Sequence, residues 1–165
     1  MPAHSLESAP AGRRSLRRAG PVALLMLVLV CAAAPAGATL GGPLASVESD
    51  RMALQAHSRH TEHAAFTLHE ITLPNRGVVR EYVSPAGQVF AVTWHGPFLP
   101  NMEQLMGAHL QAIRRASHTQ RGGLGHFAAS TDEVSFVNNG RMRSFHGAAY
   151  LIHGIPSGAS VHDIQ

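Results

Sequence analysis

The sequence contains almost no cysteine and no lysine. Cys31 is the single cysteine among 165 residues, and all 13 basic residues are arginines. A disulfide needs two cysteines, so the chain cannot form one within itself. This excludes a small scaffold held together by disulfides. We therefore expect a fold that is stabilised by its own core.

The chain also lacks an apolar run long enough to span a membrane comfortably. Its longest apolar run, residues 22–34, is followed by Pro35 and Gly37, whereas a membrane helix needs about 20 apolar residues. Small residues occupy the positions that a signal peptidase recognises, Ala36 and Ala38. Four cationic residues precede the run: Arg13, Arg14, Arg17 and Arg18.

This arrangement is typical of an export signal. We expect residues 1–38 to form a signal peptide that is cleaved between Ala38 and Thr39, which predicts a periplasmic or secreted protein. The alternative is an uncleaved leader that anchors the chain. Contact with a membrane is expected only through this leader before cleavage.

Beyond the leader, neither sign of charge is in excess. Four of the 13 arginines and one of the 10 acidic residues precede Thr39, which leaves nine of each in the mature chain. The net charge of +3 therefore belongs to the leader. A neutral chain has no basic surface for a phosphate backbone, so we expect no nucleic-acid partner.

The mature chain predicts an arm followed by one small domain. Residues 39–64 are rich in Gly, Pro, Ser, Ala and His without a clear period, which predicts a flexible His-rich arm. Residues 65–165 predict a small α+β domain. Alternating apolar residues indicate strands at 66–73, 78–83 and 89–95. A helix is expected from about residue 102 to 120, with Asn101 as its N-cap.

The last third of the chain predicts a hairpin. Residues 133–137 and 142–152 are strand-like, and Asn138, Asn139 and Gly140 between them are typical of a tight turn. The expected architecture is a single antiparallel sheet of about five strands. It consists of a three-strand meander, one helix packed on one face, and the hairpin.

Histidine is the most unusual component, with 12 in the chain. His57, His60 and His63 are spaced three residues apart, so on a helix they would share one side. Neutral imidazoles bind Zn, Cu or Ni. These three residues are the candidate metal ligands, and the alternative is a polar arm that binds no metal.

A candidate ligand groove follows the third expected strand. Trp94, His95 and Phe98 are placed to line a small apolar groove between the sheet and the helix. The sequence contains no recognisable catalytic motif: no thiol remains after the leader, and no serine lies in a Gly-x-Ser-x-Gly turn. We therefore expect no catalytic residue and no bound organic cofactor.

Several segments together resemble a family of short bacterial exported proteins, domain of unknown function 2844. The likeness lies in residues 38–42, 79–82, 87–94 and 147–151, together with Gly96, Pro97, Pro100 and the expected helix. It covers nearly all of the mature chain. The resemblance implies a proteobacterial periplasmic or secreted protein, and it implies no activity, ligand or catalytic residue.

Three functional hypotheses remain open at this point. The leading one is an exported, non-catalytic binding or accessory module that serves an envelope protein or a small ligand. The alternative is a His-rich transition-metal-binding protein. The second alternative is an enzyme of unrecognised type.

Overall fold

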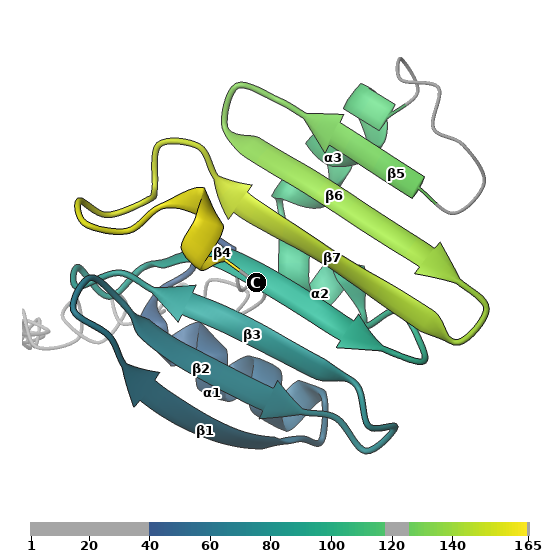
Figure 1. The fold of residues 1–165 in the computed structure, drawn as a ribbon, viewed down its shortest axis with the longest axis horizontal. Coiled ribbons are helices and arrows are strands. Elements are labelled where there is room, and N and C mark those ends of the chain that lie inside the picture. Colours follow the sequence, from purple (N-terminus) through teal and green to yellow (C-terminus); the bar gives the residue numbers. More distant parts are fainter. Residues whose placement is uncertain (1–39, 118–125, 165) are drawn as a thin grey trace, which may run out of the picture. The chain divides into compact units, whose positions relative to one another are not determined.

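The structure is a computed structural model that describes residues 40–117 and 126–164. Its centre is one antiparallel sheet of seven strands in the order β1-β2-β3-β4-β7-β6-β5 (Figure 1). The strands are β1 (His57–Glu62), β2 (Thr67–Thr72), β3 (Val78–Val83), β4 (Val89–Gly96), β5 (His126–Ser130), β6 (Val134–Arg141) and β7 (Ser144–Leu151).

The α-helices lie on one face of the sheet, behind the strands in Figure 1. They are α1 (Leu44–Ala53), α2 (Met102–Met106) and α3 (His109–Ser117). The C-terminal segment, with the short 3-10 helix η2 (Val161–Asp163), lies over part of the opposite face. We call the face that carries the α-helices the helix face, and the other the open face. Within the described ranges, no helix is long and apolar enough to cross a membrane.

The main core lies between the helices and the helix face. Val79, Val92, Trp94 and Phe136 point from the sheet into it. The helices contribute Val47, Leu105, Met106, Leu110 and Ile113. A smaller cluster lies on the open face, where Tyr82, Phe90 and Ala91 pack with Ile164 near the C-terminus. The helix face is therefore more extensively covered than the open face.

The sequence predicted the class of fold correctly and underestimated its size. The mixed α+β architecture, the single antiparallel sheet and the three strands around β2, β3 and β4 are confirmed. The sheet has seven strands instead of about five, because β1 and β5 were not predicted. The expected single helix is divided into α2 and α3 at Gly107, whose φ is +48°. Asn101 caps α2 as expected: its side chain accepts hydrogen bonds from the backbone N–H groups of Glu103 and Gln104.

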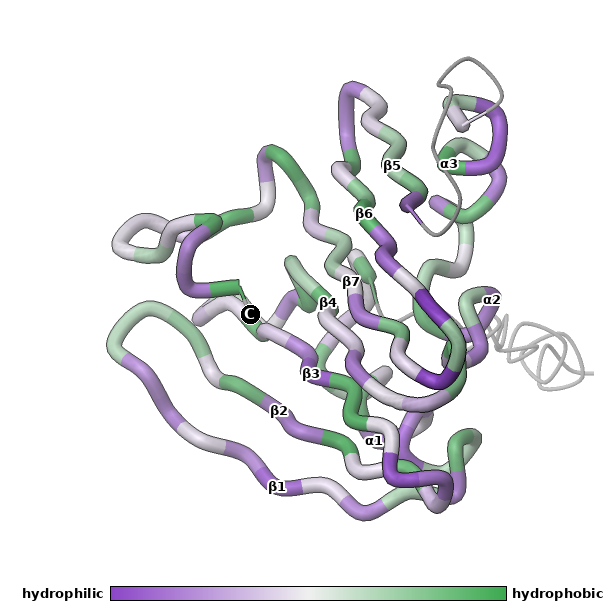
Figure 2. Tube along the Cα trace, turned by 45° about the vertical axis from the view of Figure 1, so that its right-hand side comes forward, coloured by the Kyte–Doolittle hydropathy of each residue, from purple (hydrophilic) through white to green (hydrophobic). Residues whose placement is uncertain are grey.

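The prediction of a flexible arm at residues 39–64 is wrong for most of that segment. It forms α1 and the edge strand β1, which pairs with β2 along its whole length. All six residues of β1 are polar and exposed, so the strand has no alternation of apolar residues to reveal it. Figure 2 shows this hydrophilic edge beside β2, which also contains the apolar residues Leu68 and Ile71. A polar edge strand also disfavours pairing with other chains.

The predicted turn at Asn138, Asn139 and Gly140 is also wrong. β6 continues through all three residues, and the hairpin turns at Met142 and Arg143. Asn138 accepts a hydrogen bond from the indole of Trp94. A Cβ built on Gly140 would lie only 2.5 Å from the Phe145 ring, so this ring packs closely against Gly140. Contacts across the sheet therefore hold these residues in strand geometry.

Candidate functional site

The open face carries a row of polar side chains that crosses four strands. His126 of β5 pairs with Asn139 of β6, Asn139 pairs with His146 of β7, and His146 pairs with His95 of β4. Directly paired residues of an antiparallel sheet project to the same side. We call these four residues the histidine row. It places three imidazoles and one amide on the same line across the sheet.

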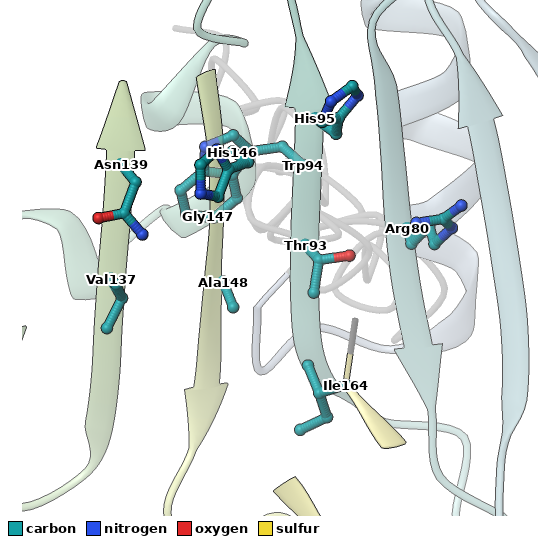
Figure 3. A pocket seen from close by; sticks show the side chains of 10 residues that line it. All are labelled: Arg80, Thr93, Trp94, His95, Val137, Asn139, His146, Gly147, Ala148 and Ile164. Atoms are coloured by element: carbon teal, nitrogen blue, oxygen red, sulfur yellow. The ribbon is translucent and has the colours of Figure 1, made fainter. Parts of the chain in front are cut away.

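A pocket of about 420 Å³ lies on the open face beside this row. Its volume falls within the range of small-molecule sites, about 300–1,000 Å³. Figure 3 shows how the lining side chains are distributed over β3, β4, β6 and β7. The lining residues are Arg80, Thr93, Trp94, His95, Val137, Asn139, His146, Gly147, Ala148 and Ile164.

Small residues on β7 form the floor of this pocket. Gly147 has no side chain, and the indole of Trp94 lies against it on the helix face. The indole is held in place by a hydrogen bond from Nε1 to Oδ1 of Asn138, at 2.9 Å, and by the ring of Phe136, at a centroid distance of 5.3 Å. Ala148, the next residue of β7, points to the open face, and its methyl group leaves space for the pocket. The pocket therefore exists because β7 carries little side-chain bulk at its centre.

Beside the pocket, three charged residues form a ladder across the strands β1, β2 and β3. Glu70 accepts from Arg59 at 2.7 Å and from Arg80 at 2.9 Å. Partial burial opposes ionisation of Glu70, but the hydrogen bonds from Arg80 and Arg59 outweigh it and hold the pKa of this carboxyl below its usual value. The ladder contains two cations and one anion, so it carries one net positive charge.

The described residues that line the pocket include no carboxylate. Their polar groups are one guanidinium, two imidazoles, one amide and one hydroxyl, and their apolar groups come from Trp94, Val137, Ala148 and Ile164. This combination gives the pocket hydrogen-bond donors and positive charge at one part and an apolar surface at another. It fits a small anion that has an apolar portion.

The structure brings together two of the three residues predicted for the groove. Trp94 and His95 both line the pocket, although from opposite faces of β4, whereas Phe98 does not line it and is 56% exposed. The groove was expected between sheet and helix. The pocket lies on the open face instead, because the space under the helices is filled by the main core.

The three predicted metal ligands do not converge. His57 and His60 are three residues apart on β1, so their side chains point to opposite faces. His63 lies beyond the strand, and its ring stacks on Phe66 at 4.6 Å. Among residues 40–117 and 126–164, no group of three His, Cys, Asp or Glu side chains is placed to hold a metal ion. The predicted cleavage residues Ala38 and Thr39 lie outside the described ranges.

His146, Asn139 and Arg80 were not among the candidate site residues predicted from the sequence. Asn139 and His146 lie more than 40 positions along the chain from Trp94 and His95, whereas Arg80 lies on the preceding strand, and the register of β3, β4, β7 and β6 places all of them together. Asn139 was assigned to a turn, which removed it from consideration. The strand-like pattern around His146 indicated that this residue lies on a strand, but it gave no information on which strand pairs with it.

A second hollow on the open face has a different character. Its volume is about 440 Å³, and it lies nearer to η2 and β2. Glu70 and Asp163 are among its lining residues, together with Arg80 and His162. Charges of both signs are thus present, so this hollow does not favour a ligand of one charge.

The comparisons with known proteins identify a family and give no function. The family model described as protein of unknown function (DUF2844) matches residues 36–164. No curated protein and no solved structure matches the chain significantly. The matched region contains every described strand and helix, and with it the whole pocket. The chain therefore belongs to this family of unknown function, DUF2844.

Proposed function

We propose that this chain is an exported, non-catalytic binding module that holds a small anionic ligand in the pocket on the open face. The observation that carries the proposal is the lining itself: His95, His146, Asn139 and Arg80 surround a floor of small residues, and no described lining residue is acidic. Aromatic carboxylates of modest size match this chemistry, because they combine one negative charge with an apolar ring.

Ligand binding is tested by filling the pocket. Ala148→Leu places a branched side chain over the floor, and we expect it to weaken the binding of benzoate by about tenfold or more, which corresponds to about 1.4 kcal/mol. The matched control is Ala128→Leu, on the same face of β5 and outside the lining. Trp94 is the only tryptophan, so its fluorescence reports binding.

Two results would contradict the pocket as the binding site. One is an unchanged affinity for benzoate in Ala148→Leu. The other is an equal loss of affinity in Ala128→Leu, which would indicate a general effect of added bulk on the sheet. Benzamide serves as the neutral analogue, and we expect it to bind more weakly than benzoate because it lacks the charge.

Export of the protein is the second part of the proposal. The basic and apolar leader supports it, together with the small residues before Thr39. Protein recovered from its native host is expected to begin at Thr39, as measured by N-terminal sequencing and intact mass. Recovery of a cytosolic product that keeps Met1 would contradict export. It would not contradict ligand binding in the pocket. An envelope protein is then the natural partner of the loaded module.

A further inference from the structure

His60 and His69 form a pair of imidazoles on the helix face of the outer strands. The two residues are direct cross-strand partners on β1 and β2. Their ring centroids are 5.8 Å apart, with an angle of 33° between the ring planes. Directly paired side chains in an antiparallel sheet project to the same side. The pair is therefore held by the strand register, without a flexible connection between its members.

The Nε2 atom of His69 is buried and has no hydrogen-bond partner among the described residues. A buried nitrogen without a partner costs about 1–3 kcal/mol. In the neutral form of histidine one ring nitrogen keeps a lone pair and can bind a metal ion.

The charges near this pair favour a cation. Glu81 is the partner of His69 on its other side, in the same row of the sheet, and its side chain is fully buried. Glu62 follows His60 by two residues on β1, and so shares its face. The two arginines of the outer strands, Arg59 and Arg80, belong to the open face, where they hold Glu70. The helix face of these strands therefore carries imidazole and carboxylate groups.

We propose that His60 and His69 bind one divalent late transition-metal ion of the Cu²⁺, Ni²⁺ or Zn²⁺ class. Imidazole nitrogen suits these ions, and the exposed carboxylate of Glu62 on the same face adds favourable charge. Two protein ligands make an exchangeable site. His60 is exposed, so the ion reaches the pair from solvent.

This site differs from the one predicted from the sequence. It keeps His60, replaces His57 and His63 with His69, and depends on the pairing of β1 with β2. It is also separate from the proposed ligand pocket, because the pocket lies on the open face between β3 and β6. The two proposals can therefore fail independently.

Metal titration of variants tests the pair. The full chain is used with Cys31→Ser in every variant, so that the single thiol does not compete for the ion. We expect His60→Gln and His69→Gln each to weaken Cu²⁺ and Zn²⁺ binding by about tenfold or more. His57→Gln is the matched control, because it removes an exposed histidine from the opposite face of the same strand. We expect the affinity of His57→Gln for each metal ion to stay within about twofold of that of the parent.

Electron paramagnetic resonance of the Cu²⁺-loaded protein gives a readout that folding alone does not change. We expect nitrogen hyperfine structure from two imidazoles in the parent and from one in His60→Gln. His60 is exposed on an edge strand, so this variant is expected to fold, and its melting temperature verifies that.

Three outcomes would overturn the proposal. The first is unchanged metal affinity in both His60→Gln and His69→Gln. The second is an equal loss in His57→Gln. The third is a loss confined to His95→Gln/His146→Gln, which would place the ion in the pocket on the open face.

Discussion

Gly147→Ala is expected to destabilise the protein by about 3 kcal/mol. A Cβ at this position would overlap Cζ2 of Trp94 and the backbone oxygen of Val137, and would lie 2.7 Å from Cε2 of Trp94. The indole is fixed by Asn138, and the oxygen belongs to the paired strand β6, so neither moves easily. Chemical denaturation measures the loss. For a domain of this size it corresponds to a fall of about 10 °C in melting temperature.

The neighbouring residue provides the control for Gly147→Ala. Ala148→Ser adds one heavy atom to the same strand, on the opposite face, and is expected to change stability by no more than about 0.5 kcal/mol. A double variant Gly147→Ala/Trp94→Phe should lose less than the sum of the two single variants, because a smaller ring relieves part of the overlap. If Gly147→Ala were as stable as the parent, the close packing of Trp94 against β7 would be wrong.

Asp50→Asn is expected to stabilise the protein at alkaline pH. Asp50 is almost fully buried on α1, and its Oδ1 accepts a hydrogen bond from Gln104 of α2. Its Oδ2 has no hydrogen-bond partner within the described ranges. Burial raises the pKa of this carboxyl to about 6, although the hydrogen bond from Gln104 acts in the opposite direction. The folded protein therefore holds a proton on Asp50 that the unfolded chain releases near pH 4.

The sign of the effect follows from this difference in proton binding. Between about pH 4 and pH 6 the folded state binds more protons at Asp50 than the unfolded state, so the contribution of Asp50 to stability falls as pH rises. Above about pH 6 Asp50 is ionised in both states, and the folded protein then bears the full free-energy cost of burying this charge. The full pKa difference corresponds to about 3 kcal/mol, and relaxation around the buried carboxyl reduces the expected gain in Asp50→Asn to about 2 kcal/mol.

Denaturation at pH 8 and at pH 4 measures this gain. Asn resembles the protonated carboxyl and keeps an acceptor for Gln104, so the gain over the parent should be present at pH 8 and nearly absent at pH 4. Asp132→Asn is the control, because Asp132 is exposed and its variant should show the same difference from the parent at both values. A gain of equal size at pH 4 and pH 8 would show that the burial of a charge is not its cause.

The sequence predicted those parts of the fold whose pattern is local. The alternation of apolar residues that includes Val92 and Trp94 identified β4, although Phe90 lies on the opposite face from these two residues. Asn101 identified the start of α2, because this signal also lies within a few residues. β1 could not be found in this way, since its six residues are all polar and gain their strand geometry from β2. The Asn-Gly signal at Asn139 failed for the same reason: contacts with Trp94 and Phe145 across the sheet outweighed the local preference for a turn.

The candidate site could be predicted only in part, because it depends on strand order. Trp94 and His95 were identified from their place on a clear strand. Pairing of β4 with β7 brings His146 opposite His95 although 51 positions separate them along the chain. The same limit applies to His60 and His69, which are close in sequence but were assigned to different segments. A residue pattern indicates that a strand is present, and it does not specify the neighbouring strand.

The ligand pocket is the central claim, and nuclear magnetic resonance of the isotope-labelled protein tests it most directly. Benzoate is titrated at pH 5.5, and the shifts of the backbone amides are followed. We predict that the largest saturable changes occur at His95, Asn139, His146 and Gly147, on adjacent strands of the open face. Absence of saturable change, or changes confined to the helices α1, α2 and α3, would contradict the account.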